Sequence, residues 1–230
     1  MSGTVDVVEV HRFRLDLSPP EVESLAGLLD VRERARLEML RSAEHRRRFT
    51  VAHARTRLVL ADRLGVPSSR VRFRFGPYGK PGLDGDAQTR RCQFSLTHSG
   101  DLAVLALCHD RRVGVDVEHV DRSRDPDRFA ARWFPAHESA WVSGAAAPDR
   151  LRAFLRLWTR KEACVKATGG RLVQGLALPV GTAPCPRTVD GPPGFLGPWT
   201  VTDLPEGRAH VGAVALEGTR PFRVMERSAG

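Results

Sequence analysis

The stretch LRAFLRLWTRKEACVK, from Leu151 to Lys166, has the residue spacing of an amphipathic helix. Its apolar residues recur every three or four positions, which places them on one side of a 3.6-residue helix. Glu162 falls on that side, one turn beyond Trp158, and Lys161 and Lys166 flank it at the two edges. A carboxylate on the core-facing side of a helix is costly unless a charged group meets it. A metal ion, a cation or a transferable proton would serve; the alternative is a solvated pair between Glu162 and Lys166.

Length and composition predict a globular protein with a core of its own. The chain has 230 residues, of which 41% are hydrophobic and 27% charged, enough for one large domain or two small ones. The N-terminal residues MSGTVDVVEV show no basic start followed by an apolar run, and no segment has the length of a membrane span. The four cysteines lack the spacing of metal ligands or paired thiols. We therefore expect a cytoplasmic protein with reduced thiols.

The net charge of +9 favours anionic partners. The basic residues comprise 33 arginines and only three lysines, Lys80, Lys161 and Lys166. Where arginine is the default cation, a lysine marks a place that favours a compact ammonium over a planar fork. Two of the lysines lie on the predicted helix, and the third lies in a Gly-Lys-Pro turn.

Short strands and arginine-rich helices are predicted for the rest of the chain. Residues 5–17 alternate like a half-buried strand, and 102–108 form a continuous apolar run typical of a buried strand. Residues 31–64 predict one or two helices whose arginines form either a solvated face or a surface for phosphates or an acidic partner. Residues 199–204 and 209–216 predict a final hairpin, and we expect the last dozen residues to be ragged.

The segment VGVDVEHV, from Val113 to Val120, places two carboxylates on one face of a strand. Its valines at alternate positions point one way, while Gly114, Asp116 and Glu118 point the other. The two carboxylates would then lie about 6.6 Å apart along the strand. Side-by-side carboxylates repel each other, and a divalent cation such as Mg²⁺ is the usual remedy. The alternative is an edge strand with a solvated acidic face.

His98 lies in the polar sequence Thr97-His98-Ser99-Gly100, which we expect to interrupt two apolar strands. Its imidazole either fills a turn and bonds to the backbone or donates to a phosphate. Together with the two carboxylates and Glu162, this histidine suggests a site for one Mg²⁺ with cations for bound phosphates. Such a set of groups suits a reaction at a pyrophosphate.

The order of these motifs resembles the 4'-phosphopantetheinyl transferases of the surfactin-synthetase-activating type. GVDVE at 114–118 is followed about forty residues later by WTRKEA at 158–163 and by Lys166. FSLTHSG at 94–100 and GKP at 79–81 precede them in the family's order, and all three lysines fall on motif positions. The resemblance covers roughly residues 32–178.

The resemblance implies an α+β fold that is a pseudodimer of two similar halves, residues 1–111 and 112–230, with coenzyme A in the cleft between them. It implies a monomeric enzyme that transfers the 4'-phosphopantetheine arm of coenzyme A to a serine of an apo acyl or peptidyl carrier protein, as in polyketide or nonribosomal peptide biosynthesis. Adenosine 3',5'-bisphosphate would be released, and neither nucleic acid nor membrane would be a partner.

The resemblance also implies a role for each matching residue. Mg²⁺ would be held by Asp116, Glu118 and Glu162 with the pyrophosphate of the coenzyme, and Glu162 would be the base, a metal ligand or both. Lys166 would contact the pyrophosphate and offset its charge, His98 would contact a phosphate, Lys80 and Thr97 the adenosine end, and Arg48 the 3'-phosphate, with further contacts among Arg32, Arg34 and Arg36. The family usually has serine at the position of Thr97, and lysines where these early arginines stand.

Two other functions are compatible with parts of the sequence. A nucleic-acid-binding protein would explain the arginines but leaves the three carboxylates without a role. A Mg²⁺-dependent phosphohydrolase would use the same carboxylates with water as the nucleophile. Neither explains the ordered motifs, so we favour the transferase.

Overall fold

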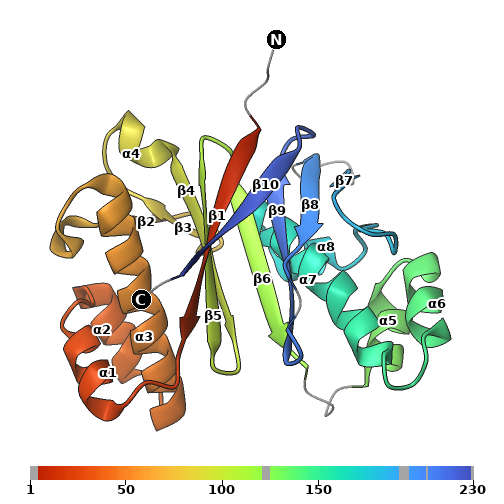
Figure 1. The fold of residues 1–230 in the computed structure, drawn as a ribbon, viewed down its shortest axis with the longest axis horizontal. Coiled ribbons are helices and arrows are strands. Elements are labelled where there is room, and N and C mark those ends of the chain that lie inside the picture. The colour runs from red at the N-terminus through yellow and green to blue at the C-terminus, as the bar shows by residue number, and fades with distance from the viewer. Residues whose placement is uncertain (1–4, 121–124, 192–196, 206, 229–230) are drawn as a thin grey trace.

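Two four-stranded sheets form the centre of the molecule, and helices lie on the outer side of each (Figure 1). The computed structural model describes residues 5–120, 125–191, 197–205 and 207–228. The strands are β1 (Asp6–Arg14), β2 (Phe73–Phe75), β3 (Pro81–Leu83), β4 (Cys92–Ser99), β5 (Leu102–His109), β6 (Val113–His119), β7 (Arg187–Val189), β8 (Trp199–Asp203), β9 (His210–Glu217) and β10 (Phe222–Ser228). The first sheet has the order β10-β1-β5-β4 and the second β6-β9-β8-β7, while β2 and β3 form a separate hairpin. This architecture confirms the predicted α+β class.

Helix boundaries follow the capping residues that the sequence offers. The helices are α1 (Pro19–Ala26), α2 (Val31–Glu38), α3 (Ala43–Leu64), the 3-10 turn η1 (Ser68–Arg70), α4 (Ala87–Arg91), α5 (Pro126–Trp133), α6 (Ala136–Gly144), α7 (Arg150–Thr168) and α8 (Leu172–Gly175). A capping box between Ser18 and Glu21 starts α1. Helices α3 and α7 end at Gly65 and Gly169, whose φ angles of 64° and 74° are left-handed. Over the described residues, no helix combines the length and the apolar character that crossing a membrane requires.

Buried side chains form three apolar clusters that separate the layers. One cluster lies between α3 and the first sheet and includes Phe13, Leu60, Phe94 and Leu105. A second lies where α7 packs on the second sheet and includes Phe154, Leu157, Trp199 and Val201. The third is contributed by both sheets and includes Val10, Val104, Val115 and Val214. The order of layers is therefore helix, sheet, sheet, helix.

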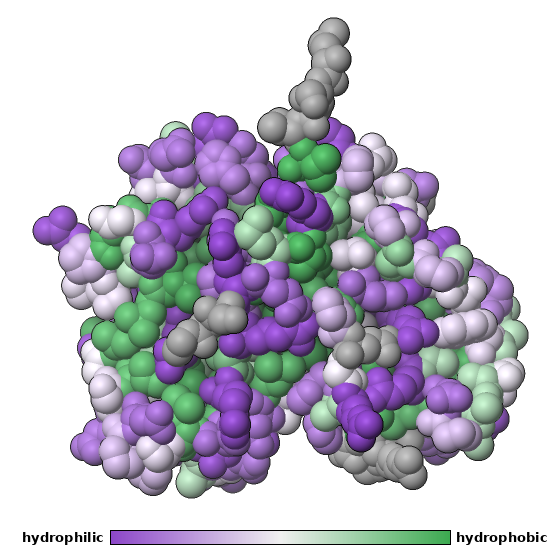
Figure 2. Space-filling model, viewed as in Figure 1, coloured by the Kyte–Doolittle hydropathy of each residue, from purple (hydrophilic) through white to green (hydrophobic). Residues whose placement is uncertain are grey.

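A groove between the N-terminal helices leaves apolar side chains visible on the face shown in Figure 2, over α1, α2 and α3. Leu17, Val22 and Leu37 are among the residues that line it, and its volume is about 570 Å³. None of the predicted site residues lines this groove.

The C-terminal strand β10 returns to the first sheet and pairs in parallel with β1. Phe222 and Val224 pack against the cluster between the two sheets. The prediction that the last dozen residues are ragged was therefore wrong for the described part; residues 229–230 lie outside it. Strand β10 gains backbone pairing and apolar burial from distant segments, and a short, arginine-flanked sequence does not reveal either one.

Strand β6 and helix α7 approach each other with no side chain between them at Gly114. A Cβ atom at this position would lie 2.0 Å from the carbonyl oxygen of Ala163 and 2.4 Å from the amide nitrogen of Ala167. Only glycine allows two backbones to come this close. The contact fixes α7 against the face of β6 that carries Asp116 and Glu118.

We predict that Gly114→Ala lowers the free energy of unfolding by about 3 kcal/mol, since overpacking against backbone atoms cannot be relieved by a rotamer change. Gly144→Ala is the matched control, because a Cβ there meets nothing within 4 Å. It should change stability by less than about 0.5 kcal/mol. Equilibrium unfolding in urea measures both, and equal stabilities of the two variants would contradict the close approach.

Candidate active site

Asp116 of β6 is buried against α7, with 4% of its surface exposed. Its Oδ1 accepts hydrogen bonds from Thr97 Oγ1 at 3.0 Å and from Lys166 Nζ at 2.6 Å. Its Oδ2 is buried and has no hydrogen-bond partner among the described residues. Burial raises the pKa of Asp116, while the ammonium of Lys166 acts in the opposite direction. One oxygen of this carboxylate is thus held by a cation, and the other remains an acceptor.

Glu118, two residues further along β6, is held by neutral donors. Trp158 Nε1 of α7 donates to its Oε1 at 3.1 Å, and Ser99 Oγ of β4 donates to its Oε2 at 3.0 Å. These donors fix the orientation of the carboxylate.

Glu162 is half-buried on α7, next to the two carboxylates of β6. Burial, and then the charges of Asp116 and Glu118, raise its pKa to about 7. The predicted core-facing placement was only partly right: α7 is buried on nearly all sides, and Glu162 lies on the less buried one. Lys166 contacts Asp116 across the gap, so a solvated pair of Glu162 with Lys166 does not describe this side of the helix.

The three carboxylates meet some of the requirements of a divalent-cation site. Asp116 offers a buried, unpartnered oxygen, and the like charges are close enough to raise the pKa of Glu162. Hard divalent cations prefer such oxygen ligands. Within the described residues, however, no three His, Cys, Asp or Glu side chains form a metal centre by themselves. The ammonium of Lys166 provides the counter-charge at Asp116 instead.

His98 lies within β4 and not in a break between strands, so that prediction was wrong. The pairing of β4 with β5 continues as far as Ser99 and Leu102. The chain stays extended because a polar sequence on this face meets polar partners from β6. The pKa of His98 is lowered by burial and then by neighbouring basic side chains, among them Lys166 and Arg48. His98, Lys166 and Arg48 are therefore close enough for their charges to interact.

Arg48 lies on α3 beside the turn between β4 and β5. It pairs with Asp101 at 3.1 Å and with Glu44 at 2.7 Å. Arg47 contacts the same oxygen of Asp101 at 3.2 Å. The two arginines share the carboxylate of Asp101, and Glu44 adds a second carboxylate, so the charges paired at this turn balance.

Lys80 joins the hairpin of β2 and β3 to the second sheet. Its Nζ donates to the carbonyl oxygens of Val113 and Ala167, each at 3.0 Å. Burial lowers the pKa of Lys80 to about 8. Lys80 also borders a cavity of about 240 Å³ whose wall includes Phe94 and Lys166. This cavity opens between β4, the hairpin and the C-terminal end of α7.

Lys161 does not lie at the edge of the α7 surface, and that prediction was wrong. Its Nζ is 2.6 Å from Glu138 Oε2, and both side chains are fully buried. It also donates to the carbonyl of Leu178 and lies 4.6 Å from the centre of the Phe134 ring. Periodicity could not predict this placement, because the partner Glu138 comes from another helix, α6. Lys161 therefore supports α7 from behind and does not face the carboxylates.

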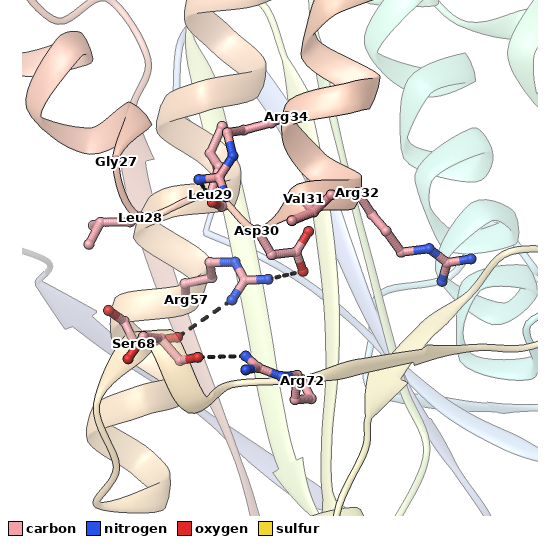
Figure 3. A pocket seen from close by; sticks show the side chains of 11 residues that line it. Gly27, Leu28, Leu29, Asp30, Val31, Arg32, Arg34, Arg57, Ser68 and Arg72 are labelled. Atoms are coloured by element: carbon pink, nitrogen blue, oxygen red, sulfur yellow. Dashed lines mark hydrogen bonds and ion pairs between the residues drawn. The ribbon is translucent and has the colours of Figure 1, made fainter.

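Arg32 and Arg34 of α2 border a different cavity, of about 530 Å³, and Arg36 is not among the residues that line it (Figure 3). Arg57, which is fully buried, ties the start of α2 to α3 by pairing with Asp30 and Glu33. Arg34 folds back onto the carbonyl of Leu29, whereas Arg32 extends away from it and lies 5.0 Å from the Phe75 ring. Neither the carboxylates of β6 nor Lys166 line this cavity.

Sequence reasoning missed Ser99 and Trp158 as partners of Glu118. Trp158 was counted only as an apolar residue of α7, although its indole N–H is a donor that needs an acceptor when buried. Ser99 follows Ser95 and Thr97 at a spacing of two. That spacing places three hydroxyls on one face of a strand. It is the feature of the sequence from which hydrogen bonds to a neighbouring polar face could have been predicted.

Comparisons with known proteins agree with the geometry. A sequence model of the 4'-phosphopantetheinyl transferase superfamily matches residues 112–206, which include β6 and α7. The 4'-phosphopantetheinyl transferase HetI of Nostoc sp. is 32% identical over 213 residues, or 91% of this chain and 88% of HetI. The 4'-phosphopantetheinyl transferase gsp of Aneurinibacillus migulanus is 31% identical over 54% of this chain and 47% of gsp. The 4'-phosphopantetheinyl transferase AcpT of Salmonella typhimurium is 41% identical over 42% of this chain and 48% of AcpT.

We predict that Lys161→Met lowers the free energy of unfolding by about 3–5 kcal/mol, because it leaves Glu138 charged and buried without its partner. Adding Glu138→Gln should recover at least half of that loss, since the amide oxygen can still accept from the backbone N–H of Gly181, which now donates to Glu138. Urea unfolding of the wild type, both single variants and the double variant measures the coupling. Additive losses would show that the two charges do not interact.

Proposed function

The chain belongs to the 4'-phosphopantetheinyl transferase superfamily, and on that premise we propose that it transfers the 4'-phosphopantetheine arm of coenzyme A to a serine hydroxyl of an apo acyl or peptidyl carrier protein. The reaction would depend on Mg²⁺ and release adenosine 3',5'-bisphosphate. The observation that carries the proposal is the meeting of Asp116 and Glu118 on β6 with Glu162 and Lys166 on α7.

Coenzyme A would bind with its phosphates near Arg48, His98 and Lys166. Burial and then the charges of Lys166 and Arg48 lower the pKa of His98, and an anionic ligand would offset the repulsion among these basic groups. Lys80 and Thr97 would border the adenosine end. Both already have hydrogen-bond partners. Lys80 would act by shaping the wall of the 240 Å³ cavity, and Thr97 by holding Lys166 and Asp116 behind it.

Among the arginines of α2, Arg32 is the best candidate for a further contact with the 3'-phosphate. Arg34 is folded back onto its own helix, whereas Arg32 extends to Phe75 on the hairpin that leads to Lys80. A guanidinium that lies over an aromatic ring keeps N–H donors at its edge for phosphate oxygens.

Mg²⁺ would be held by Asp116, Glu118 and Glu162. A bound divalent cation would offset the negative charge of the phosphates during transfer. The buried Oδ2 of Asp116, which has no hydrogen-bond partner among the described residues, supports this assignment.

Glu162 would take the proton from the serine hydroxyl as its oxygen attacks the β-phosphorus. A pKa of about 7 suits a base that must exchange a proton at neutral pH. The new oxygen–phosphorus bond forms while the bond from that phosphorus to the bridging oxygen breaks, and the electron pair leaves with the adenosine bisphosphate. Lys166, whose Nζ lies 2.6 Å from Asp116, would offset charge that develops on that leaving group.

The two halves, residues 1–111 and 112–230, would form a pseudodimer within a monomeric, cytoplasmic chain. Each half contributes most of one sheet and the helices on its outer side, and β10 crosses back to pair with β1. The net charge of +9 would attract an acidic carrier protein by long-range electrostatic steering.

The test is to incubate the protein with coenzyme A, Mg²⁺ and an apo carrier protein and to weigh the carrier by mass spectrometry. We expect the addition of one phosphopantetheine per carrier. Glu162→Gln should lower the rate about 10²- to 10⁴-fold, because the base is lost while the shape is kept. Glu38→Gln, at an exposed position of α2, is the matched control and should leave the rate unchanged.

Three outcomes of this assay would contradict the proposal. Breakdown of coenzyme A without a carrier would indicate a phosphohydrolase. Tight, salt-sensitive binding of nucleic acid with no mass gain on any carrier would indicate a nucleic-acid-binding protein. Equal rates for Glu162→Gln and Glu38→Gln would exclude Glu162 as the base.

A further inference from the structure

A row of three hydroxyls on β4 joins the first sheet to the second. Strands β4 and β6 are edge strands of different sheets, and they lie side by side. Ser95 Oγ accepts from the amide of Val115 at 3.2 Å, and Ser99 Oγ accepts from the amide of His119 at 2.9 Å. These oxygens satisfy N–H groups at the edge of β6 that a neighbouring strand would otherwise bind.

Ser99 has a second interaction, which Ser95 lacks among the contacts the structure describes. A hydroxyl has one proton to donate, and Ser99 directs it to Oε2 of Glu118 at 3.0 Å. Because its oxygen is already fixed by the amide of His119, the direction of that proton is fixed as well. Glu118 is therefore clamped from two sides, by Ser99 of β4 and by Trp158 of α7.

We propose that Ser99 is a positioning residue, which holds the carboxylate of Glu118 in the orientation that a divalent cation requires. As far as the cation is concerned, the inference rests on the proposed function. Glutamate has more rotatable bonds than aspartate, so its carboxylate gains more from a fixed donor. Groups that orient metal ligands in this way contribute about 10- to 100-fold to metal affinity.

The chain offers a matched control in Ser95. Ser95→Ala and Ser99→Ala each remove one hydroxyl that accepts a backbone N–H of β6. Only Ser99→Ala also removes the donor to Glu118. A difference between the two variants therefore reports the orientation of the carboxylate and not the junction of the sheets.

The experiment measures binding of Mn²⁺ to the protein alone by electron paramagnetic resonance, since Mn²⁺ shares the preference of Mg²⁺ for carboxylate oxygens. We expect Ser99→Ala to raise the dissociation constant about 10-fold. Ser99→Thr, which keeps a hydroxyl, should stay within about twofold of wild type, as should Ser95→Ala. Thermal unfolding of each variant checks that it is folded. If Ser99→Ala does not fold, Ser99→Cys, which offers only a weak donor, replaces it with the same expectation.

Equal dissociation constants for wild type and Ser99→Ala would overturn the proposal. An equal loss of Mn²⁺ affinity in Ser95→Ala would also overturn the proposal, because any break in the junction between the sheets would then weaken Mn²⁺ binding. A wild-type protein that binds no Mn²⁺ would overturn it as well. The transfer assay is run separately on the wild type. A protein that shows the expected Mn²⁺ pattern yet modifies no carrier contradicts the proposed function and leaves the role of Ser99 supported.

Discussion

The contact of β6 with α7 at Gly114 is the constraint on which the site depends. With no side chain between the two backbones, their relative position is set by atoms that cannot change rotamer. Asp116 and Glu118 follow Gly114 on the same face of β6, so they are carried directly against Glu162 and Lys166. Four charged groups are thereby held together, although the repulsion between the carboxylates alone would separate them.

Arginine and lysine have different roles in this chain. Arg57, Arg111 and Arg160 are buried, and each uses its planar fork to join a carboxylate with backbone carbonyls from another segment. All three lysines, in contrast, contact or belong to α7. Lys80 bonds to the carbonyl of Ala167, Lys161 to Glu138, and Lys166 to Asp116 and Thr97. An ammonium is more compact than a guanidinium, and at Lys80 it fits between the backbone carbonyls of β6 and α7.

Local patterns in the sequence predicted the elements that carry the site. The alternation around Asp116 fixed the strand and its two faces, and the three- and four-residue spacing before Glu162 fixed the helix. The patterns did not predict contacts between distant segments. The pairing of β10 with β1, the burial of Lys161 against Glu138 and the clamp on Glu118 all join residues far apart in the chain. Local periodicity carries no information about such partners. The error at His98 had the same origin, because the polar residues of β4 stay extended through backbone pairing with β5 and side-chain partners on β6.

The junction between the sheets explains how polar groups are accommodated at the centre of the fold. Strands joined by backbone hydrogen bonds lie about 4.8 Å apart. If β4 and β6 were paired in this way, the polar backbone atoms between them would bond to each other and could not orient the carboxylates. Here side-chain hydroxyls of β4 take the place of backbone carbonyls at the edge of β6. A hydroxyl can accept one hydrogen bond and still donate another. Ser99 accepts from the amide of His119 and donates to Glu118, and Thr97 accepts from Lys166 and donates to Asp116. The join that connects the two sheets is therefore also the means by which the carboxylates are held in place.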